Sequence, residues 1–402
     1  MSTLNPSIDT KLKPLEQPQS RYRVVIVHPS AGVNWSGGSE SFAIEMSRHL
    51  SPYFDVELLA GGPAVPNYYP AGGISRTLGR KLLRNPYVYP LLKRFSTHPD
   101  IVLEHATSFP TCALRLLTRP ADLIFPCNDY GGLAMAAFVR YFRRTPVLFK
   151  AHNGLLGNGK PLARALRFRP DHLLVFSTEM EAFIHHTHPH QATSSMPNGV
   201  DLGQFSPDAP AIPLDLPRPV VLCVASLDRR DHKRVHLAIE AMHRLGRGSL
   251  LICGDGPDRA YYQAMGEQLL GRDRVLIRSF PYAQMPSVFT SADLFTLPSD
   301  QEPFGNVYLE AMACGLPVVA TDDPSRRAIV GQAGVLCDVT QPEAYGAALQ
   351  QALEHNWGLL PRANASRFSW ESIALRYRDL ILSIIETHRV QGSKAQNYAK
   401  YI

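Results

Sequence analysis

The stretch EPFGNVYLEAMACGLPVV, from Glu302 to Val319, decides the fold of this chain. It predicts a loop that ends at Phe304-Gly305, a helix with Asn306 as its N-cap, and a buried strand over residues 317–320. The amides at the start of a helix lack partners within the helix and carry a partial positive charge. The amides after Asn306 would therefore face an anion, and they could hold a diphosphate without a metal ion.

Two glutamates bracket the start of this helix. Glu310 is the only charged residue between Val307 and Val319, and a buried carboxylate without hydrogen-bond donors is strongly unfavourable. Ribose hydroxyls would supply such donors, whereas the alternative is a glutamate on a solvated helix face. Glu302 lies in the preceding loop, where it could reach a donor sugar or could be an ordinary loop carboxylate in water.

Outward from this stretch, short apolar runs alternate with helix-like segments. The first run, residues 24–27, is followed by a loop over residues 28–38 and by a helix with Phe42, Met46 and Leu50 on one face. The loop has neither the spacing of a dinucleotide-binding loop nor the lysine of a P-loop, which disfavours hydride transfer and NTP hydrolysis. Further strands are expected at residues 101–103, 123–125, 147–149, 173–175, 220–224, 250–253, 275–277 and 294–297, the pattern of doubly wound parallel sheets.

The chain divides near its middle. Its 402 residues are too many for one ordinary core, and prolines crowd between Pro207 and Pro219, which favours a linker there. Thr340 and Glu343 form a possible capping box for a late helix. The predicted organisation is a disordered tail (1–20), two Rossmann-like domains (21–203 and 204–369), a helix that packs back on the first domain (370–390) and a short tail (391–402).

Composition narrows the class of protein. Apolar residues make up 45% and charged residues 19%, as in globular proteins. No apolar run of signal-peptide or membrane-spanning type occurs, and the six cysteines include no C-x-x-C pair, so reduced thiols in the cytoplasm are expected. The net charge of +6 suggests an anionic partner. Four histidines, His185, His186, His188 and His190, follow a helix beside a proline, and we expect no metal there.

Short motifs accompany the two glutamates in a fixed order. They are Gly37-Gly38-x-Glu40, His152-Asn153-Gly154, Pro197-Asn-Gly-Val-Asp201, Gly254-Asp-Gly-Pro257 and Ala292-Asp-Leu-Phe-Thr-Leu-Pro-Ser299. With these motifs the chain resembles family 4 glycosyltransferases of the GT-B fold over roughly residues 21–385. The resemblance implies an α/β fold of two facing Rossmann-like αβα domains with a cleft between them and a C-terminal crossover helix. It also implies a retaining transferase, with an acceptor-side first domain and a second domain that binds the nucleotide sugar.

The resemblance assigns roles in the donor site by position. Glu310 would bind the ribose and Glu302 the donor sugar, while Lys233 would neutralise the diphosphate that leaves. The family usually has an arginine near Ser226, which is absent here, so Arg229 or Arg230 is expected to compensate. Other expected donor contacts come from the loops of both domains: Gly37, Gly38, Gly254, Gly256, Phe280, Pro281, Phe304, Gly305, Asn306 and Val307.

Two further assignments concern the sugar and the acceptor. His152 follows a strand and would lie near the transferred sugar, or it could be a histidine hydrogen-bonded at a strand end. Asn128 and Asp129 follow another strand and could orient the acceptor. The expected catalytic residues are Glu302, His152 and Lys233. No cofactor or metal is expected, because the chain has no Asp-x-Asp of the metal-dependent, single-domain glycosyltransferases.

A basic segment suggests a membrane partner. Apolar and tyrosine residues interleave there with Arg76, Arg80, Lys81, Arg84, Lys93 and Arg94. This pattern suits an anionic membrane surface, and it also suits an ordinary amphipathic helix that covers a sheet. We expect a cytoplasmic protein, with peripheral membrane attachment if the first interpretation holds.

The predicted function is retaining transfer from a UDP- or GDP-sugar to a hydroxyl of a lipid-linked or saccharide acceptor, in polysaccharide, lipopolysaccharide or glycolipid synthesis. One alternative is a sugar-nucleotide epimerase or hydrolase on the same fold. Another is a non-catalytic subunit that binds a nucleotide sugar. A nucleic-acid partner is not expected, since no recognised binding module appears.

Overall fold

The computed structural model describes most of the chain between Arg21 and Tyr398. The described ranges are 21–33, 37–63, 65–85, 89–90, 99–127, 131–152, 154, 159–229, 232–300 and 302–398, with backbone alone for Pro161 and 392–398. Several predicted residues lie outside these ranges: Lys93, Arg94, Asn128, Asp129, Asn153 and Arg230, together with the predicted tail 1–20.

The N-terminal half is built around two parallel sheets in one layer. The first has the order β3-β2-β1-β4 and the second the order β5-β6-β7, and a parallel bridge between Ile124 and Val147 joins them. The strands are β1 (Arg23–His28), β2 (Asp55–Ala60), β3 (Tyr68–Pro70), β4 (Leu123–Pro126), β5 (Leu148–Lys150), β6 (His172–Val175) and β7 (Thr193–Ser195). The helices are α1 (Gly38–Leu50), α2 (Arg76–Leu82), α4 (Pro99–Thr118), α5 (Gly132–Arg143), α6 (Lys160–Leu166) and α7 (Thr178–Thr187).

Strand β1 shows why an unbroken apolar run forms here. Val24 and Ile26 pack into a core with α1 and α15, whereas Val25 and Val27 pack into a second core with α4 and α5. Because both faces of the sheet are covered, alternation of polar and apolar residues is lost along the strand.

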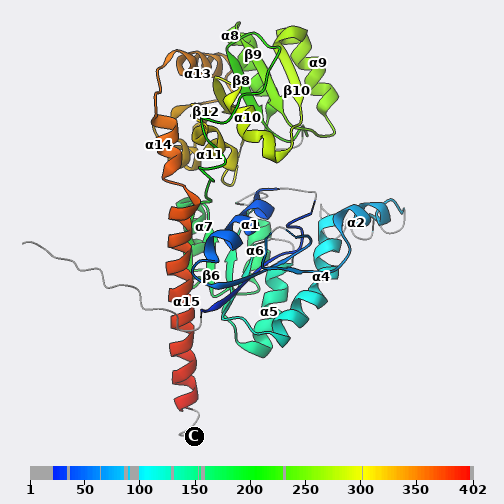
Figure 1. Cartoon of the computed structure of the whole chain (residues 1–402), viewed down its shortest axis with the longest axis vertical. Helices are drawn as coiled ribbons and strands as arrows, with labels where there is room; N and C mark the ends of the chain where they lie inside the picture. The colour runs from blue at the N-terminus through cyan, green and yellow to red at the C-terminus, as the bar shows by residue number, and fades with distance from the viewer. Residues whose placement is uncertain are drawn as a thin grey trace, which may run out of the picture.

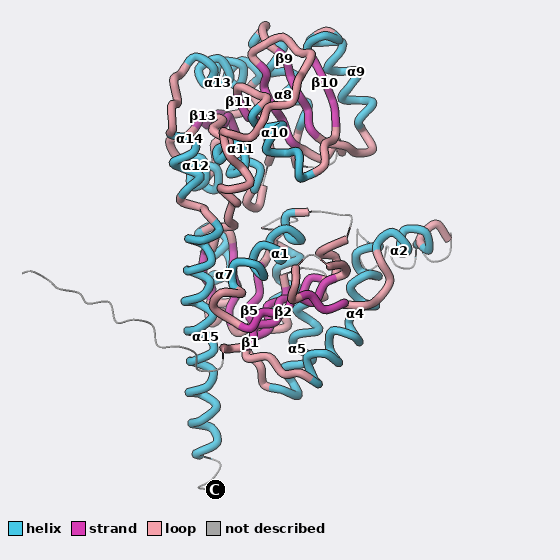
Figure 2. The backbone as a smooth tube through the Cα atoms, viewed as in Figure 1, coloured by secondary structure: helices cyan, strands magenta, loops and turns pink. Residues whose placement is uncertain are grey.

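The C-terminal half has one parallel sheet of six strands in the order β10-β9-β8-β11-β12-β13 (Figure 2). The strands are β8 (Val220–Val224), β9 (Ser249–Cys253), β10 (Val275–Arg278), β11 (Leu294–Leu297), β12 (Val318–Thr321) and β13 (Gly334–Cys337). The helices are α8 (Val235–Leu245), α9 (Arg259–Leu270), α10 (Met285–Thr290), α11 (Asn306–Ala313), α12 (Pro324–Val330), α13 (Pro342–Glu354) and α14 (Leu360–Ser366).

The long last helix, α15 (Trp370–Tyr398), crosses from the C-terminal half back along the N-terminal half (Figure 1). Val200 pairs with the chain at the start of α15 through two backbone hydrogen bonds. The amide of Val200 donates to the carbonyl of Phe368 (2.8 Å), and the amide of Trp370 donates to the carbonyl of Val200 (3.2 Å). Trp370 and Tyr377 are buried in the core of the N-terminal half. The predicted GT-B fold, with two facing αβα units and a crossover helix, is thereby confirmed.

Three local predictions are wrong. Residues 101–103 belong to helix α4 and not to a strand, because the apolar triplet continues into a pattern that buries one helical face. Asn306 is the first residue of α11, and the N-cap is Gly305, whose φ of 85° suits a glycine. The N-cap of α13 is Gln341, while the hydroxyl of Thr340 donates to Asp338, so no capping box forms with Glu343.

Substitution of Gly199 tests the junction between the halves. A Cβ atom at this residue would lie 2.4 Å from Cδ2 of Trp370. We expect Gly199→Ala to lower the free energy of unfolding by about 1–3 kcal/mol, as overpacking of a core does, measured by denaturant titration. Gly79→Ala in α2 is the control, because its Cβ would meet only ordinary contacts at 3.6 Å or more. Equal stability of both variants would show that the Trp370 packing does not hold this junction.

Candidate functional site

A cavity of about 690 Å³ lies between the two halves. Its walls come from the loops that follow the parallel strands, which is where ligands bind in open α/β sheets. Twelve of the predicted site residues line it: Gly37, Gly38, His152, Lys233, Gly254, Phe280, Glu302, Phe304, Gly305, Asn306, Val307 and Glu310.

Glu310 is a buried carboxylate in the wall of this cavity, with 8% of its surface exposed. The hydroxyl of Tyr282 donates to its Oε1 at 3.2 Å. Burial raises the pKa of Glu310 to about 7, and the hydrogen bond from Tyr282 offsets only part of that effect. A further donor from a ligand would therefore stabilise the ionised form.

Glu302 has a different environment, because Lys233 and His232 lie beside its carboxylate. Its Oε2 accepts hydrogen bonds from Lys233 and, at 2.8 Å, from the hydroxyl of Ser299, and Nε2 of His232 lies 3.3 Å from the same oxygen. Burial alone would raise the pKa of Glu302, but the hydrogen bond with His232 and the charge of Lys233 outweigh it and hold that pKa well below its ordinary value. Glu302 is thus ionised at neutral pH.

The N-terminus of α11 opens into the cavity, since Gly305, Asn306 and Val307 all line it. A Cβ atom at Gly305 would lie 2.5 Å from the ring of Tyr308, so this left-handed turn requires glycine. The side-chain amide of Asn198 in the N-terminal half donates to Oδ1 of Asn306 at 2.9 Å. This hydrogen bond joins the two walls of the cavity beside the helix terminus.

His152 enters the cavity from the N-terminal half, after β5. Its ring packs edge-on against Phe42 and Phe176, with centroids 5.1 and 5.9 Å apart. Burial, and then the charges of Lys150 and His28, hold the pKa of His152 well below 6.5. The imidazole is therefore neutral at pH 7 and suited to hydrogen bonding rather than to charge stabilisation.

Three of the predicted donor-site residues do not line the cavity. Arg229 forms an ion pair with Asp258 at 2.9 Å and lies over the ring of Tyr261. Gly256 packs against the backbone of Leu227, and Pro281 is not among the lining residues. Arg230, Asn128 and Asp129 lie outside the described residues.

Sequence reasoning missed several side chains that complete the site: Ser39, Ser41, Phe176, Asn198, His232, Tyr282 and Ser299. Three of them stand beside predicted residues in the sequence, since Ser39 follows Gly38, His232 precedes Lys233 and Tyr282 follows Pro281. Asn198 lies in the Pro-Asn-Gly-Val-Asp motif, which supported the family resemblance but was given no role in the site. Proximity to a predicted residue, or a place in such a motif, was the available signal for these residues.

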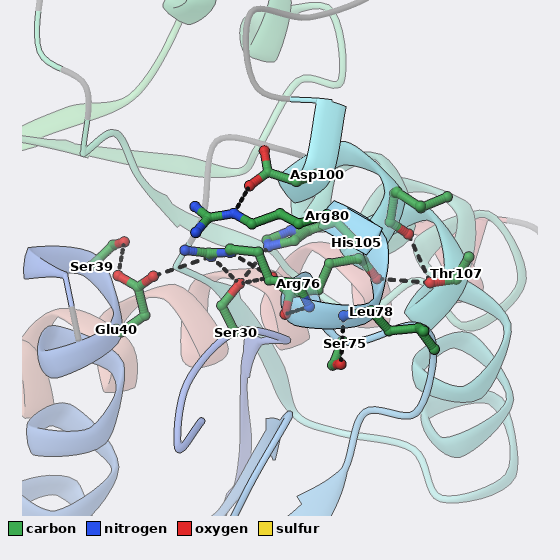
Figure 3. A network of polar contacts seen from close by, with 12 residues as sticks. Ser30, Ser39, Glu40, Ser75, Arg76, Leu78, Arg80, Asp100, His105 and Thr107 are labelled. Carbon is green, nitrogen blue, oxygen red and sulfur yellow. Dashed lines mark hydrogen bonds and ion pairs between the residues drawn. The ribbon is translucent and has the colours of Figure 1, made fainter. Parts of the chain in front are cut away.

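A second polar network lies at the same edge of the N-terminal sheet (Figure 3). Arg76 donates from Nε to Glu104 at 3.2 Å and from Nη2 to Ser30 at 2.7 Å, and Nη2 lies 3.4 Å from Oε1 of Glu40. The guanidinium is therefore turned inward, and the prediction that Arg76 faces a membrane is wrong. Among the described residues, no group of three His, Cys, Asp or Glu side chains could hold a metal ion.

Glu310 gives a pH-dependent test of the cavity wall. Between pH 4.5, the ordinary pKa, and pH 7 the folded protein keeps a proton that the unfolded chain has lost, so wild-type stability falls as pH rises through this window. Glu310→Gln lacks that loss. We expect the free energy of unfolding of the variant, relative to that of the wild type, to rise by on the order of 3 kcal/mol between pH 4.5 and 8, measured by urea titration.

Glu302→Gln is the matched control for this experiment. Because the pKa of Glu302 is lowered, its difference from the wild type should stay constant over the same pH range. A constant difference for Glu310→Gln as well would mean that the carboxylate at position 310 is not desolvated.

Comparison with known proteins agrees with this geometry. The family of glycosyl transferases group 1 matches residues 206–367. A D-inositol 3-phosphate glycosyltransferase of Segniliparus rotundus is 32% identical over 242 residues, which cover 55% of this chain and 53% of that protein. A GDP-mannose-dependent alpha-(1-6)-phosphatidylinositol monomannoside mannosyltransferase of Mycolicibacterium smegmatis is 32% identical over 185 residues, which cover 41% and 48%. The chain thus spans about half the length of these curated relatives.

Solved structures share the whole fold. HepE from Anabaena, in complex with UDP and glucose, superposes with a TM-score of 0.66 at 20% identity and covers 90% of this chain and 100% of its own. Sucrose-phosphate synthase from Thermosynechococcus elongatus superposes with a TM-score of 0.70 at 20% identity and covers 91% and 100%. The glycosyl transferases group 1 family thus matches residues 206–367, and the whole chain has the GT-B fold that its resemblance to family 4 glycosyltransferases implies.

Proposed function

We propose that this chain is a hexosyltransferase that moves a sugar from a UDP- or GDP-sugar to a hydroxyl acceptor, with retention of configuration. The observation that carries the proposal is Glu310, a carboxylate buried beside an anion-binding helix terminus in the same cavity as Glu302. A nucleotide sugar offers a complementary set of groups, namely ribose hydroxyls, a diphosphate and a sugar ring.

In the proposed complex the diphosphate lies between the two halves. The amides at the start of α11 and the ammonium of Lys233 would stabilise the charge that develops as the glycosidic bond breaks. Gly37 and Gly38 would face the same phosphates. A Cβ atom at Gly38 would come no nearer than 3.8 Å to Nδ2 of Asn306, so the first loop lies close to α11.

Glu302 would position Lys233 and contact the donor sugar. The contacts that the described residues make with its carboxylate all use Oε2, which leaves Oε1 for a sugar hydroxyl. A carboxylate held by a lysine and a histidine is a poor nucleophile, so we favour attack by the acceptor on the face from which the diphosphate departs. Neutral His152 would hydrogen-bond the transferred sugar from the opposite wall.

The comparisons support this choice of donor and acceptor. The relatives described above use GDP-mannose or act on inositol phosphate and phosphatidylinositol mannoside, and HepE is solved with UDP. We infer a lipid-linked or saccharide acceptor in glycolipid, lipopolysaccharide or polysaccharide synthesis. Six cysteines without a C-x-x-C pair favour a cytoplasmic location. An epimerase or hydrolase, or a subunit that binds the donor without turnover, would be separated from this proposal by product analysis with and without acceptor.

The ribose assignment is tested by donor affinity. Removal of a charged hydrogen-bond acceptor costs about 1.5–3 kcal/mol, so Glu310→Ala should raise the dissociation constant for the donor by about 10- to 150-fold. Isothermal titration against UDP-, GDP-, ADP- and dTDP-sugars would measure this and identify the base. Glu343→Ala, at an exposed carboxylate, is the control. Unchanged donor affinity in Glu310→Ala would remove the assignment.

The role of Lys233 is tested by turnover. We expect Lys233→Ala to lower kcat/KM by about 10- to 100-fold, through loss of one charge contact with the leaving group. Arg229→Ala should stay within about twofold of the wild type, because Asp258 holds this guanidinium outside the cavity wall. A wild-type kcat/KM for Lys233→Ala, or a larger loss of kcat/KM for Arg229→Ala than for Lys233→Ala, would contradict the assignment of the leaving-group contact to Lys233.

A further inference from the structure

Large apolar side chains are exposed together on the outer surface of α5 and the end of α4. Tyr141 is 84% exposed, Leu114 64%, Phe142 58% and Phe138 44%. The rings of Phe138 and Phe142 lie 5.2 Å apart, as do those of Tyr141 and Phe142, and Phe138 also contacts Phe109 of α4. Exposed aromatic residues in contact with one another mark an interaction surface more strongly than scattered ones do.

The end of α6 extends this surface. Arg140 of α5 donates to the carbonyls of Phe168 (2.9 Å) and Arg169 (2.6 Å), which ties the turn after α6 to α5. Phe168 is 41% exposed. We call the combined surface the α5 face, and it comprises the exposed residues Leu114, Phe138, Tyr141, Phe142, Arg143, Arg144, Arg164, Arg167, Phe168 and Arg169.

The charge of the α5 face has one sign. Residues 130–170 contain eight lysines and arginines and no aspartate or glutamate, and residues 105–121 of α4 and its end also lack acidic residues. The nearest carboxylate by contact, that of Asp171, is already paired with Arg140 at 3.1 Å and accepts the amide of Val147. Arginines beside exposed aromatic rings, without carboxylates, suit a partner that is both anionic and apolar beneath its surface.

Helix α2, which the sequence offered as one possible membrane surface, is less suitable. Arg76 is turned into the network with Glu104, and Arg80 is paired with Asp100 at 2.9 Å (Figure 3). Lys81 and Arg84 remain exposed there. Among the residues that the structure describes, the α5 face offers more exposed apolar groups and more exposed arginines than α2.

We propose that the α5 face docks the protein on an anionic lipid surface. Aromatic rings at the interface and arginines against phosphate headgroups supply the two attractions that hold a peripheral protein on a bilayer. The C-terminal end of α5 lies at the end of the N-terminal half away from the C-terminal half (Figure 1). Docking would therefore leave the cavity between the halves open, and it does not depend on the proposed reaction.

Vesicle flotation of the full chain tests the proposal. The wild type should float with phosphatidylglycerol-containing vesicles and not with pure phosphatidylcholine, and flotation should decline as salt rises. Each cation near an anionic surface is worth about a fivefold gain in partition. Arg144→Glu/Arg167→Glu should therefore lower partition by at least about 20-fold, and Tyr141→Ser/Phe142→Ser should lower it on every anionic vesicle.

Matched controls use the C-terminal half and α2. Leu359→Ser and Arg272→Glu change an equally exposed leucine and arginine and should float like the wild type. Donor hydrolysis and circular dichroism should be unchanged in all variants. The proposal is overturned if the α5-face variants float normally, if Lys81→Glu/Arg84→Glu alone abolishes flotation, or if light scattering shows a dimer that the same α5-face variants dissociate without any wild-type lipid binding.

Discussion

The carboxylate of Glu310 lies in a buried wall, where Tyr282 donates to it from the edge of the cavity. Helix α11 around it is apolar, because Tyr308, Leu309, Ala311 and Met312 pack into the core of the C-terminal half. A carboxylate in such surroundings holds its proton up to about pH 7. Above that pH the ionised carboxylate destabilises the fold, unless a ligand supplies further hydrogen-bond donors. The ligand hydroxyl groups that we propose for this position would offset that loss of stability.

Sheet topology explains why Glu302 and Lys233 meet. The strands β8 and β11 are neighbours, although the strands β9 and β10 and the helices α8, α9 and α10 separate them in sequence. His232 and Lys233 follow β8 and Glu302 follows β11, and the amide of Asp300 donates to the carbonyl of His232 at 2.7 Å. The order of strands reverses at β8, which is the switch point where the loops of a parallel sheet diverge and leave room for a ligand.

Buried parallel strands were the most predictable part of the fold, because a run such as residues 220–224 is apolar on both faces. Residues 101–103 were wrongly predicted as a strand, because three consecutive apolar residues fit a helix as well as a strand. Only the pattern of the residues that follow shows that they belong to helix α4. Strand β2 was not predicted, because its aspartate and glutamate interrupt the apolar run; Glu57 is buried through ion pairs with Arg23 and Arg115. At the site, motifs pointed to Glu302 and Glu310, both of which line the cavity, but the contacts of Tyr282 with Glu310 and of Ser299 with Glu302 depend on how the loops fold.

The site is complete only when both halves are held in place, and polar contacts among the described residues join them beside the apolar packing of Trp370. Asn198 reaches across to Asn306 at the terminus of α11, and it follows Pro197, whose carbonyl, with that of Met196, accepts from the buried ammonium of Lys150. Lys150 also donates to the hydroxyl of Tyr377 on the crossover helix at 2.7 Å. Burial lowers the pKa of Lys150 well below its ordinary value, and the hydrogen bonds of this lysine join strand β5, the loop after β7 and the crossover helix. The position of the α11 terminus relative to the first glycine loop therefore depends partly on Lys150 and Tyr377, which do not line the cavity.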